Sequence, residues 1–149
     1  PPLVEADLEW RHRQALTLHQ EVGAAARPRG ETGDLSRIDL DTVIRRLVDA
    51  GLGSCPGGGA EIFASRVREQ ICDHKTDGNR WLEIARQVHN AGIRSNCTML
   101  YGHVETAEER VDHLLALRGL QDETGGFTAF ICWTFQPDHS DMADVPRAS

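Results

Sequence analysis

The stretch from Arg94 to Asp138 constrains the fold of this chain more than any other. It begins with an apolar run that ends at Tyr101, continues with a helical pattern that starts at Thr106, and returns through a pair of glycines to β-forming residues at 127–135. The helical stretch is long enough to cross back over a sheet. The pattern therefore predicts two parallel strands joined by a right-handed crossover.

In parallel α/β folds, functional groups gather at the carboxyl ends of the strands. In this chain the two ends are Gly102 to Glu105 and Gln136 to His139. We therefore expect the site to lie at these turns.

Length and charge limit the classes of function. A chain of 149 residues with 40% hydrophobic side chains is the size of one globular domain. Its formal net charge of -7 and pI near 5.4 argue against a nucleic-acid or anionic-membrane surface, because phosphate binding needs clustered Lys and Arg. We expect a small-molecule partner, and neither nucleic acid nor membrane.

The cysteines and the amino terminus indicate the cellular location of the protein. The four cysteines are far apart in the sequence, at Cys55, Cys72, Cys97 and Cys132, and they predict free thiols and no metal site. No stretch has the apolar length of a membrane helix, and the amino terminus lacks a signal pattern. The expected location is cytoplasmic.

The sequence divides into three regions. Residues 1–38 read as an irregular helix and a linker of unclear origin, 39–138 as an ordered β/α region, and 139–149 as a loose tail. The ordered region opens with an amphipathic helix in which Asp39 is the expected N-cap and Gly51 the stop. Further helices are expected from Arg66 to Cys72 and around Trp81, the latter capped by Thr76 or Asp77, before the strand that ends at Tyr101.

The helix after the central strand has a capping box, Thr106-x-x-Glu109. Its expected inner face consists of Ala107, Val111, Leu114, Leu115, Leu117 and Leu120. Asp112 and His113 are expected on the solvated or flanking side. The last strand is apolar on both faces, which predicts burial on both sides, as in parallel sheets.

Three consecutive glycines, Gly57, Gly58 and Gly59, follow Pro56 and precede Glu61. Glycines permit positive φ and close approach of a ligand to the main chain. Glycine content by itself supports two interpretations equally. One is a strand end followed by a loop. The other is a turn that cradles a cofactor, with Glu61 holding a hydroxyl or an amine.

Four segments carry a resemblance to a known family. They are P-G-G-G-A-E-I-F at 56–63, W-L-E-I-A-R at 81–86, T-M-L-Y-G-H-V-E-T at 98–106 and L-Q-D-E-T-G-G-F-T-A-F at 120–130. They resemble the radical S-adenosylmethionine enzymes of the futalosine route to menaquinone. Aminodeoxyfutalosine synthases are the most similar and dehypoxanthine futalosine cyclases the next. The resemblance implies a partial (β/α) barrel of about three strand-helix units, near strands four to six of the whole barrel.

The resemblance also implies the chemistry of the whole enzymes. They are transferases that use S-adenosylmethionine and a [4Fe–4S] cluster, and they add a 5'-deoxyadenosyl radical to a carboxyvinyloxybenzoate. The cluster is bound by a C-x-x-x-C-x-x-C loop that this chain lacks. We therefore expect the chain to be inactive by itself. A non-catalytic module that binds a nucleoside or a protein partner is the alternative.

Single residues follow from the resemblance. Gly57, Gly58, Gly59 and Glu61, together with Gly102, match positions that contact S-adenosylmethionine, whereas His103 and Glu105 match positions near the substrate. No catalytic residue is assigned. An incomplete barrel exposes strand edges and apolar helix faces, so that self-association is expected.

Overall fold

The structure is a computed structural model that describes residues 39–138 together with residues 142 and 144. The helix and linker predicted within residues 1–38 lie outside the described residues, as does most of the predicted tail. The elements follow the predicted order, with one helix, a strand, two helices, a strand, a helix and a strand.

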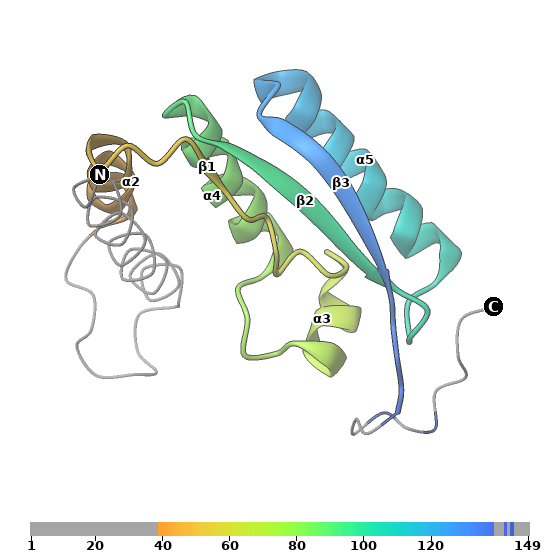
Figure 1. Cartoon of the computed structure of the whole chain (residues 1–149). Helices are drawn as coiled ribbons and strands as arrows, with labels where there is room; N and C mark the ends of the chain where they lie inside the picture. Colours follow the sequence, from red (N-terminus) through yellow and green to blue (C-terminus); the bar gives the residue numbers. More distant parts are fainter. Residues whose placement is uncertain (1–38, 139–141, 143, 145–149) are drawn as a thin grey trace, which may run out of the picture.

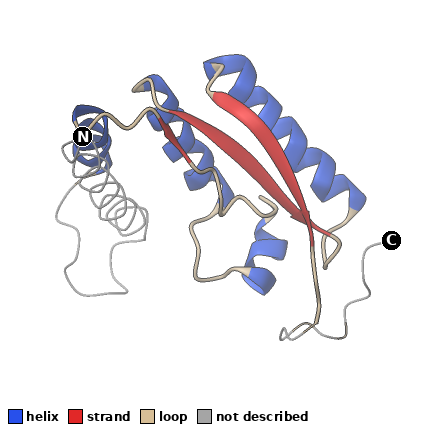
Figure 2. Ribbon diagram, viewed as in Figure 1, coloured by secondary structure: helices blue, strands red, loops and turns tan. Residues whose placement is uncertain are grey.

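A three-stranded parallel sheet forms the centre of the described region (Figure 2). It consists of β1 (Ser54–Cys55), β2 (Arg94–Tyr101) and β3 (Phe127–Thr134), in the order β1-β2-β3. Both strand pairs are parallel, with one irregularity in the β2–β3 register between Ser95 and Asn96. The predicted parallel pairing is confirmed.

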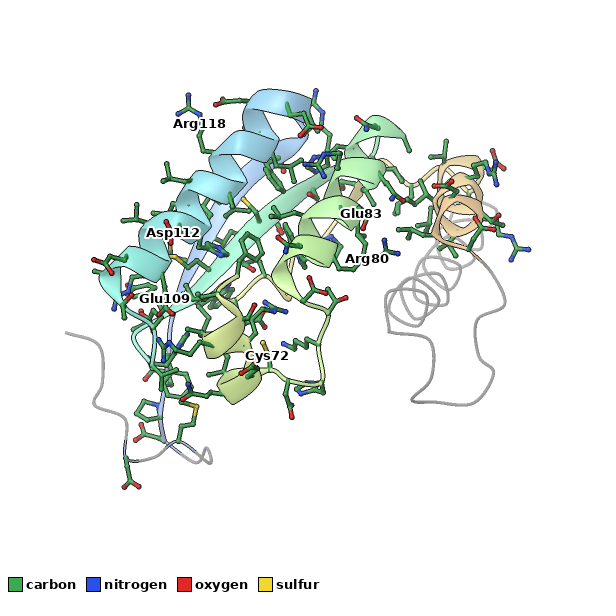
Figure 3. The ribbon with its side chains drawn as sticks, turned by 180° about the vertical axis from the view of Figure 1, so that it is seen from behind. Cys72, Arg80, Glu83, Glu109, Asp112 and Arg118 are labelled. Atoms are coloured by element: carbon green, nitrogen blue, oxygen red, sulfur yellow. The ribbon has the colours of Figure 1, made fainter. Side chains whose placement is uncertain are left out.

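Within residues 39–138, four helices accompany the sheet. They are α2 (Leu40–Asp49), α3 (Ser65–Ile71), α4 (Gly78–Asn90) and α5 (Ala107–Thr124). α4 and α5 lie behind the sheet in Figure 1 and in front of it in the reversed view of Figure 3, so both cover one face. Consecutive strands as neighbours, with helices on one face, are typical of a segment of a β/α barrel. The α/β class is therefore confirmed.

Side-chain caps begin the helices where the sequence places them. Asp39 accepts a hydrogen bond from the Thr42 amide at the start of α2, and Asp77 accepts one from the Arg80 amide at the start of α4. Thr106 and Glu109 complete the capping box of α5. These caps satisfy amide groups that have no partner within the helix, which determines where each helix begins.

In the described region, no helix has the length and apolar character that spanning a membrane requires.

Two apolar clusters hold the layers together. One joins α2 to α4 through Leu40, Val43, Ile44, Leu47, Val88 and Ile93. The other joins the loop after β1 to α3 and β2 through Ile62, Val67 and Met99. The second cluster fixes the glycine-rich loop against the sheet, because Ile62 is fully buried.

The predicted inner face of α5 is confirmed for Leu117 and Leu120 but wrong for Val111, Leu114 and Leu115, and the expected solvated or flanking position of His113 is also wrong. Val111, Leu114 and Leu115 are 52%, 40% and 63% exposed. The buried side chains of α5 are His113, Leu117 and Leu120. His113 is turned to the sheet because its Nε2 atom lies 3.0 Å from the carbonyl oxygen of Thr98 on β2. The buried Thr98 carbonyl needs a hydrogen-bond partner, so the polar His113 faces the sheet where the apolar pattern predicted leucine side chains.

The predicted burial of β3 on both faces is also wrong. Most of its residues are exposed, including Phe130 at 43% and Trp133 at 60%. β3 is an edge strand, since β2 is its only neighbour within the described sheet. The alternation of residues gives the strand two apolar faces, but burial depends on what packs against them.

Candidate functional site

The glycine-rich loop lies against the central strand. The amide of Gly57 donates a 2.6 Å hydrogen bond to the side-chain oxygen of Asn96, and the hydroxyl of Thr98 donates to the carbonyl of Gly57 at 3.3 Å. Cys97 lines a groove beside α5, so its neighbours on β2 point to the opposite face of the sheet. The loop therefore runs beside β2, and on the helix side the carbonyl of Gly58 accepts a 3.1 Å hydrogen bond from the indole nitrogen of Trp81 on α4.

The close approach of the loop to Asn96 requires glycine at position 57. A Cβ atom at Gly57 would lie 1.7 Å from the carbonyl oxygen of Asn96. The same atom at Gly58 would meet nothing within 4 Å, and Gly59 has a φ of +85°. Packing against β2 thus explains the first glycine, and backbone conformation explains the third. Gly58 is the position with open space for a ligand.

A buried arginine of α3 supports the loop from the other side. Nη1 of Arg68 donates to the carbonyl oxygens of Ala60 and Ile62 at 2.8 and 3.3 Å, and Nη2 donates to those of Gly59 and Thr76 at 3.2 and 2.5 Å. Arg68 is 4% exposed. Since it bonds carbonyl groups on both sides of Glu61, Arg68 determines the path of the loop through that residue.

Glu61 has an unusual conformation. Its φ of +40° lies in the left-handed region that non-glycine residues seldom adopt. Its amide carbonyl accepts from the amide of Leu100 at 3.1 Å, and Oε1 lies 2.5 Å from Nζ of Lys75. The side chain of Glu61 is 14% exposed. The predicted cofactor ligand is therefore held at the carboxyl end of β2, already paired with a lysine.

Three buried polar atoms near this loop have no hydrogen-bond partner among the described residues. They are Oε2 of Glu61, Nε of Arg68 and Nδ1 of His113. Burial lowers the pKa of His113 to about 4, and the charges of Arg68 and Glu61 also act on its ring. Buried hydrogen-bonding capacity therefore remains unused near the loop within the described region.

The second turn follows β2. Oε1 of Glu105 accepts from the amide of Gly102 at 2.6 Å, and Oε2 accepts from the amide of His103 at 2.9 Å. Nε of Arg110 donates to Oε1 at 2.6 Å. Burial raises the pKa of the Glu105 carboxyl, but these hydrogen bonds outweigh burial and hold the pKa below its usual value. Glu105 is thus an ionised anchor of the turn.

The imidazole of His103 is enclosed by the same turn. Its Nε2 lies 3.0 Å from the carbonyl oxygen of Leu100, and its Nδ1 lies 2.8 Å from the amide nitrogen of Val104. The side chains of His103 and Glu105 have no exposed surface. In this structure both residues bond the turn itself, and their assignment to substrate stays a prediction.

Sequence reasoning missed three residues that hold these turns, namely Arg68, Asn96 and Arg110. Their side chains bond the loop backbone, an interaction that has no sequence spacing.

The cysteines do not converge. Cys55 lies on β1, Cys72 follows α3 (labelled in Figure 3), Cys97 lies on β2, and Cys132 lies on β3. In the part of the chain that the structure describes, no group of three or more His, Cys, Asp or Glu side chains is placed to hold a metal ion. The described residues therefore do not fit an iron–sulfur cluster, which needs several cysteine thiolates together.

Comparison with known proteins confirms the resemblance. No protein-family model matches the chain. Two proteins named aminodeoxyfutalosine synthase are similar to it: that of Thermus thermophilus is 54% identical over 109 residues, and that of Streptomyces coelicolor is 50% identical over 110 residues. These alignments cover 73% and 74% of this chain but 29% and 28% of the two relatives. The chain thus spans less than a third of their length.

Two other enzyme types are similar over the same share of their length. The cyclic dehypoxanthine futalosine synthase of Streptomyces coelicolor is 44% identical over 115 residues, which is 77% of this chain and 29% of that protein. The 5-amino-6-(D-ribitylamino)uracil–L-tyrosine 4-hydroxyphenyl transferase 1 of Methanosarcina acetivorans is 46% identical over 110 residues, 74% of this chain and 29% of that protein. The chain is thus homologous to a segment of this enzyme group, and aminodeoxyfutalosine synthases are the type it matches at the higher identity.

Proposed function

We propose that residues 39–138 are a β/α segment of an aminodeoxyfutalosine synthase, a radical S-adenosylmethionine transferase of menaquinone biosynthesis. The observation that carries the proposal is the 54% identity over 109 residues with a protein of that name. Identities are lower with the 4-hydroxyphenyl transferase, at 46%, and with the cyclic synthase, at 44%; the cyclic synthase, an enzyme of the same futalosine route, is the second candidate. The whole enzyme would join a 5'-deoxyadenosyl group to a carboxyvinyloxybenzoate.

The part proposed for this segment is to hold S-adenosylmethionine, which supplies the deoxyadenosyl group when bound. Gly58 leaves open space beside the backbone, and Oε2 of Glu61 has no hydrogen-bond partner among the described residues. Gly102 would contribute by close approach of its backbone, because its amide is already donated to Glu105. These features support a ligand-facing loop and turn at the carboxyl ends of β1 and β2.

The cluster is not part of this proposal for the segment. The sequence has no C-x-x-x-C-x-x-C loop, and the described cysteines lie on separate elements. The described residues therefore take no part in binding a cluster. In this proposal the chain by itself is inactive and depends on a cluster-bearing region. The four free thiols support the proposed cytoplasmic, reducing location.

A chimera tests the assignment. Residues 39–138 replace the aligned segment of the Thermus thermophilus synthase, the protein is reconstituted anaerobically, and both 5'-deoxyadenosine and the nucleoside adduct are quantified. We expect adduct formation with the carboxyvinyloxybenzoate substrate. A folded chimera that cleaves S-adenosylmethionine but forms no adduct would contradict the synthase assignment.

The role of Glu61 is tested in the same chimera. Glu61→Gln removes a charged acceptor, so that the dissociation constant of S-adenosylmethionine should rise about tenfold, the equivalent of one lost charged hydrogen bond. Glu83→Gln on α4 is the matched control, since Glu83 is an exposed partner of Arg80. Unchanged affinity in the Glu61 variant would remove this residue from the cofactor site.

A further inference from the structure

The outward side of α5 carries a short apolar stripe. Val111 and Leu115 are 52% and 63% exposed and lie four residues apart, so they are neighbours on one face. Gly119 follows on the same face, and a Cβ atom there would meet nothing within 4 Å. We call Val111, Leu115 and Gly119 the outer stripe.

Charged residues of opposite sign continue the outer stripe at its two ends. Glu108 precedes Val111 by three residues, and Arg118 follows Leu115 by three. The spacing of 108, 111, 115, 118 and 122 is the three-four repeat by which one helix packs along another. Arg118 projects from α5 away from the sheet (Figure 3) and is 73% exposed while paired with Asp122 at 2.8 Å.

This face is complementary to itself. If a second copy of α5 runs antiparallel, with the two-fold axis midway between Val111 and Leu115, each Val111 lies opposite the Leu115 of the other copy. Each Glu108 then lies opposite an Arg118, and Gly119 lies opposite the small Ala107. Asp122 approaches the first turn of the other helix, which already carries Glu108 and Glu109, so the Glu108–Arg118 pairs and not Asp122 favour this register.

We propose that two copies of this chain associate through the outer stripe of α5, in an antiparallel, two-fold symmetric pair. A two-fold interface uses the same patch twice, so the match of Glu108 to Arg118 is made twice. The inference rests on the geometry of α5 and is independent of the proposed catalytic role.

The association should be weak. A helix of 18 residues is about 27 Å long. One helix-to-helix contact of that length buries less than the roughly 1,200 Å² of a stable interface. The net charge of -7 opposes contact between copies, so the Glu108–Arg118 pairs set orientation more than affinity. We expect a dissociation constant in the micromolar to millimolar range, above about 10⁻⁶ M.

Sedimentation equilibrium of the full chain over a concentration series tests the proposal. Leu115→Glu places a charge in the centre of the contact and should raise the dissociation constant at least about tenfold. Leu115→Gln is the second variant if the first does not fold. A monomer at all concentrations up to about 1 mM, or a dimer unaffected by either variant, would overturn the proposal.

A charge swap tests the register. Glu108→Lys and Arg118→Glu should each weaken the dimer, and the double variant should restore it to within about twofold, because both pairs are rebuilt with reversed signs. Arg80→Glu and Glu83→Lys on α4 are controls with the same charge changes on another helix. A double variant as weak as the single ones would show that another surface, such as the edge of β3, makes the contact.

Discussion

The side-chain oxygen of Asn96 lies 2.6 Å from the amide nitrogen of Gly57, so that the central strand holds the glycine-rich loop directly. The contact joins two residues 39 positions apart. Its consequence is that the loop has a defined path beside β2 without any ligand.

Gly57→Ala should destabilise the fold. The added methyl group would lie 1.7 Å from the Asn96 carbonyl oxygen, and backbone is not free to move aside. We expect a loss of about 3 kcal/mol or more in the free energy of unfolding, measured by urea titration. Gly58→Ala is the control, with about 0.5 kcal/mol or less expected, because its Cβ has open space. Equal effects of the two substitutions would contradict the predicted close contact.

Arg68→Met should destabilise the protein by about 3 kcal/mol, because four carbonyl groups lose a charged donor inside the protein. Arg80→Met on α4 removes a partly exposed ion pair with Glu83 and should cost at most about 1 kcal/mol. Thermal unfolding of both variants measures the difference. If the two variants melt at the same temperature, the loop does not depend on Arg68.

The stability of the chain should fall in acid partly through His113. Burial lowers its pKa from 6.5 to about 4 in the folded protein. Between these values the unfolded chain binds the extra proton, so stability decreases as the pH falls from about 6.5 to about 4, by about 3 kcal/mol in total. Urea titrations at several pH values measure the slope.

A variant isolates the histidine from the carboxylates. His113→Gln can keep a donor toward the Thr98 carbonyl, but it has no imidazole to protonate, so the slope between pH 6.5 and 4 should be shallower. His74→Gln is the control, because His74 is largely exposed. A slope that is unchanged in the His113 variant would place the acid sensitivity elsewhere.

The cysteines should differ in reactivity. Cys132 is exposed, whereas Cys72 and Cys97 are buried, and burial raises the pKa of Cys97 to about 11. Labelling of the folded chain with a thiol reagent should therefore modify Cys132 first, and Cys132→Ser should remove the fast phase. Peptide mass mapping identifies the modified residue. Fast labelling of Cys97 would show that β2 and α5 open at this position.

Anaerobic reconstitution with iron and sulfide should leave the isolated chain with well under one cluster per chain. The thiols lie on four separate segments, and a cluster needs several thiolates together. Iron and sulfide analysis measures the content, with the chimera described above as the positive control. A stoichiometric cluster would mean that the cysteines converge in another arrangement of the chain.

Much of the described fold could be predicted from the sequence. Asp39, Asp77 and the Thr106–Glu109 box mark the helix starts because capping is a local interaction between residues two or three positions apart. The parallel strands follow from the length of the intervening helices. The family resemblance was readable from short motifs, and it is confirmed by the identity of 54% with an aminodeoxyfutalosine synthase.

Burial and side-chain partners were decided by the tertiary structure. α5 has apolar residues on two sides, so periodicity did not indicate that His113 faces the sheet while Leu115 faces outward. The two apolar faces of β3 are exposed because the strand lies at the edge of the described sheet. The supports of the loop, Arg68 and Asn96, bond backbone groups that only folding brings near. The sequence alone determined the local caps, the order of elements and the family resemblance, whereas contacts between distant residues required the three-dimensional arrangement, because no local pattern encodes them.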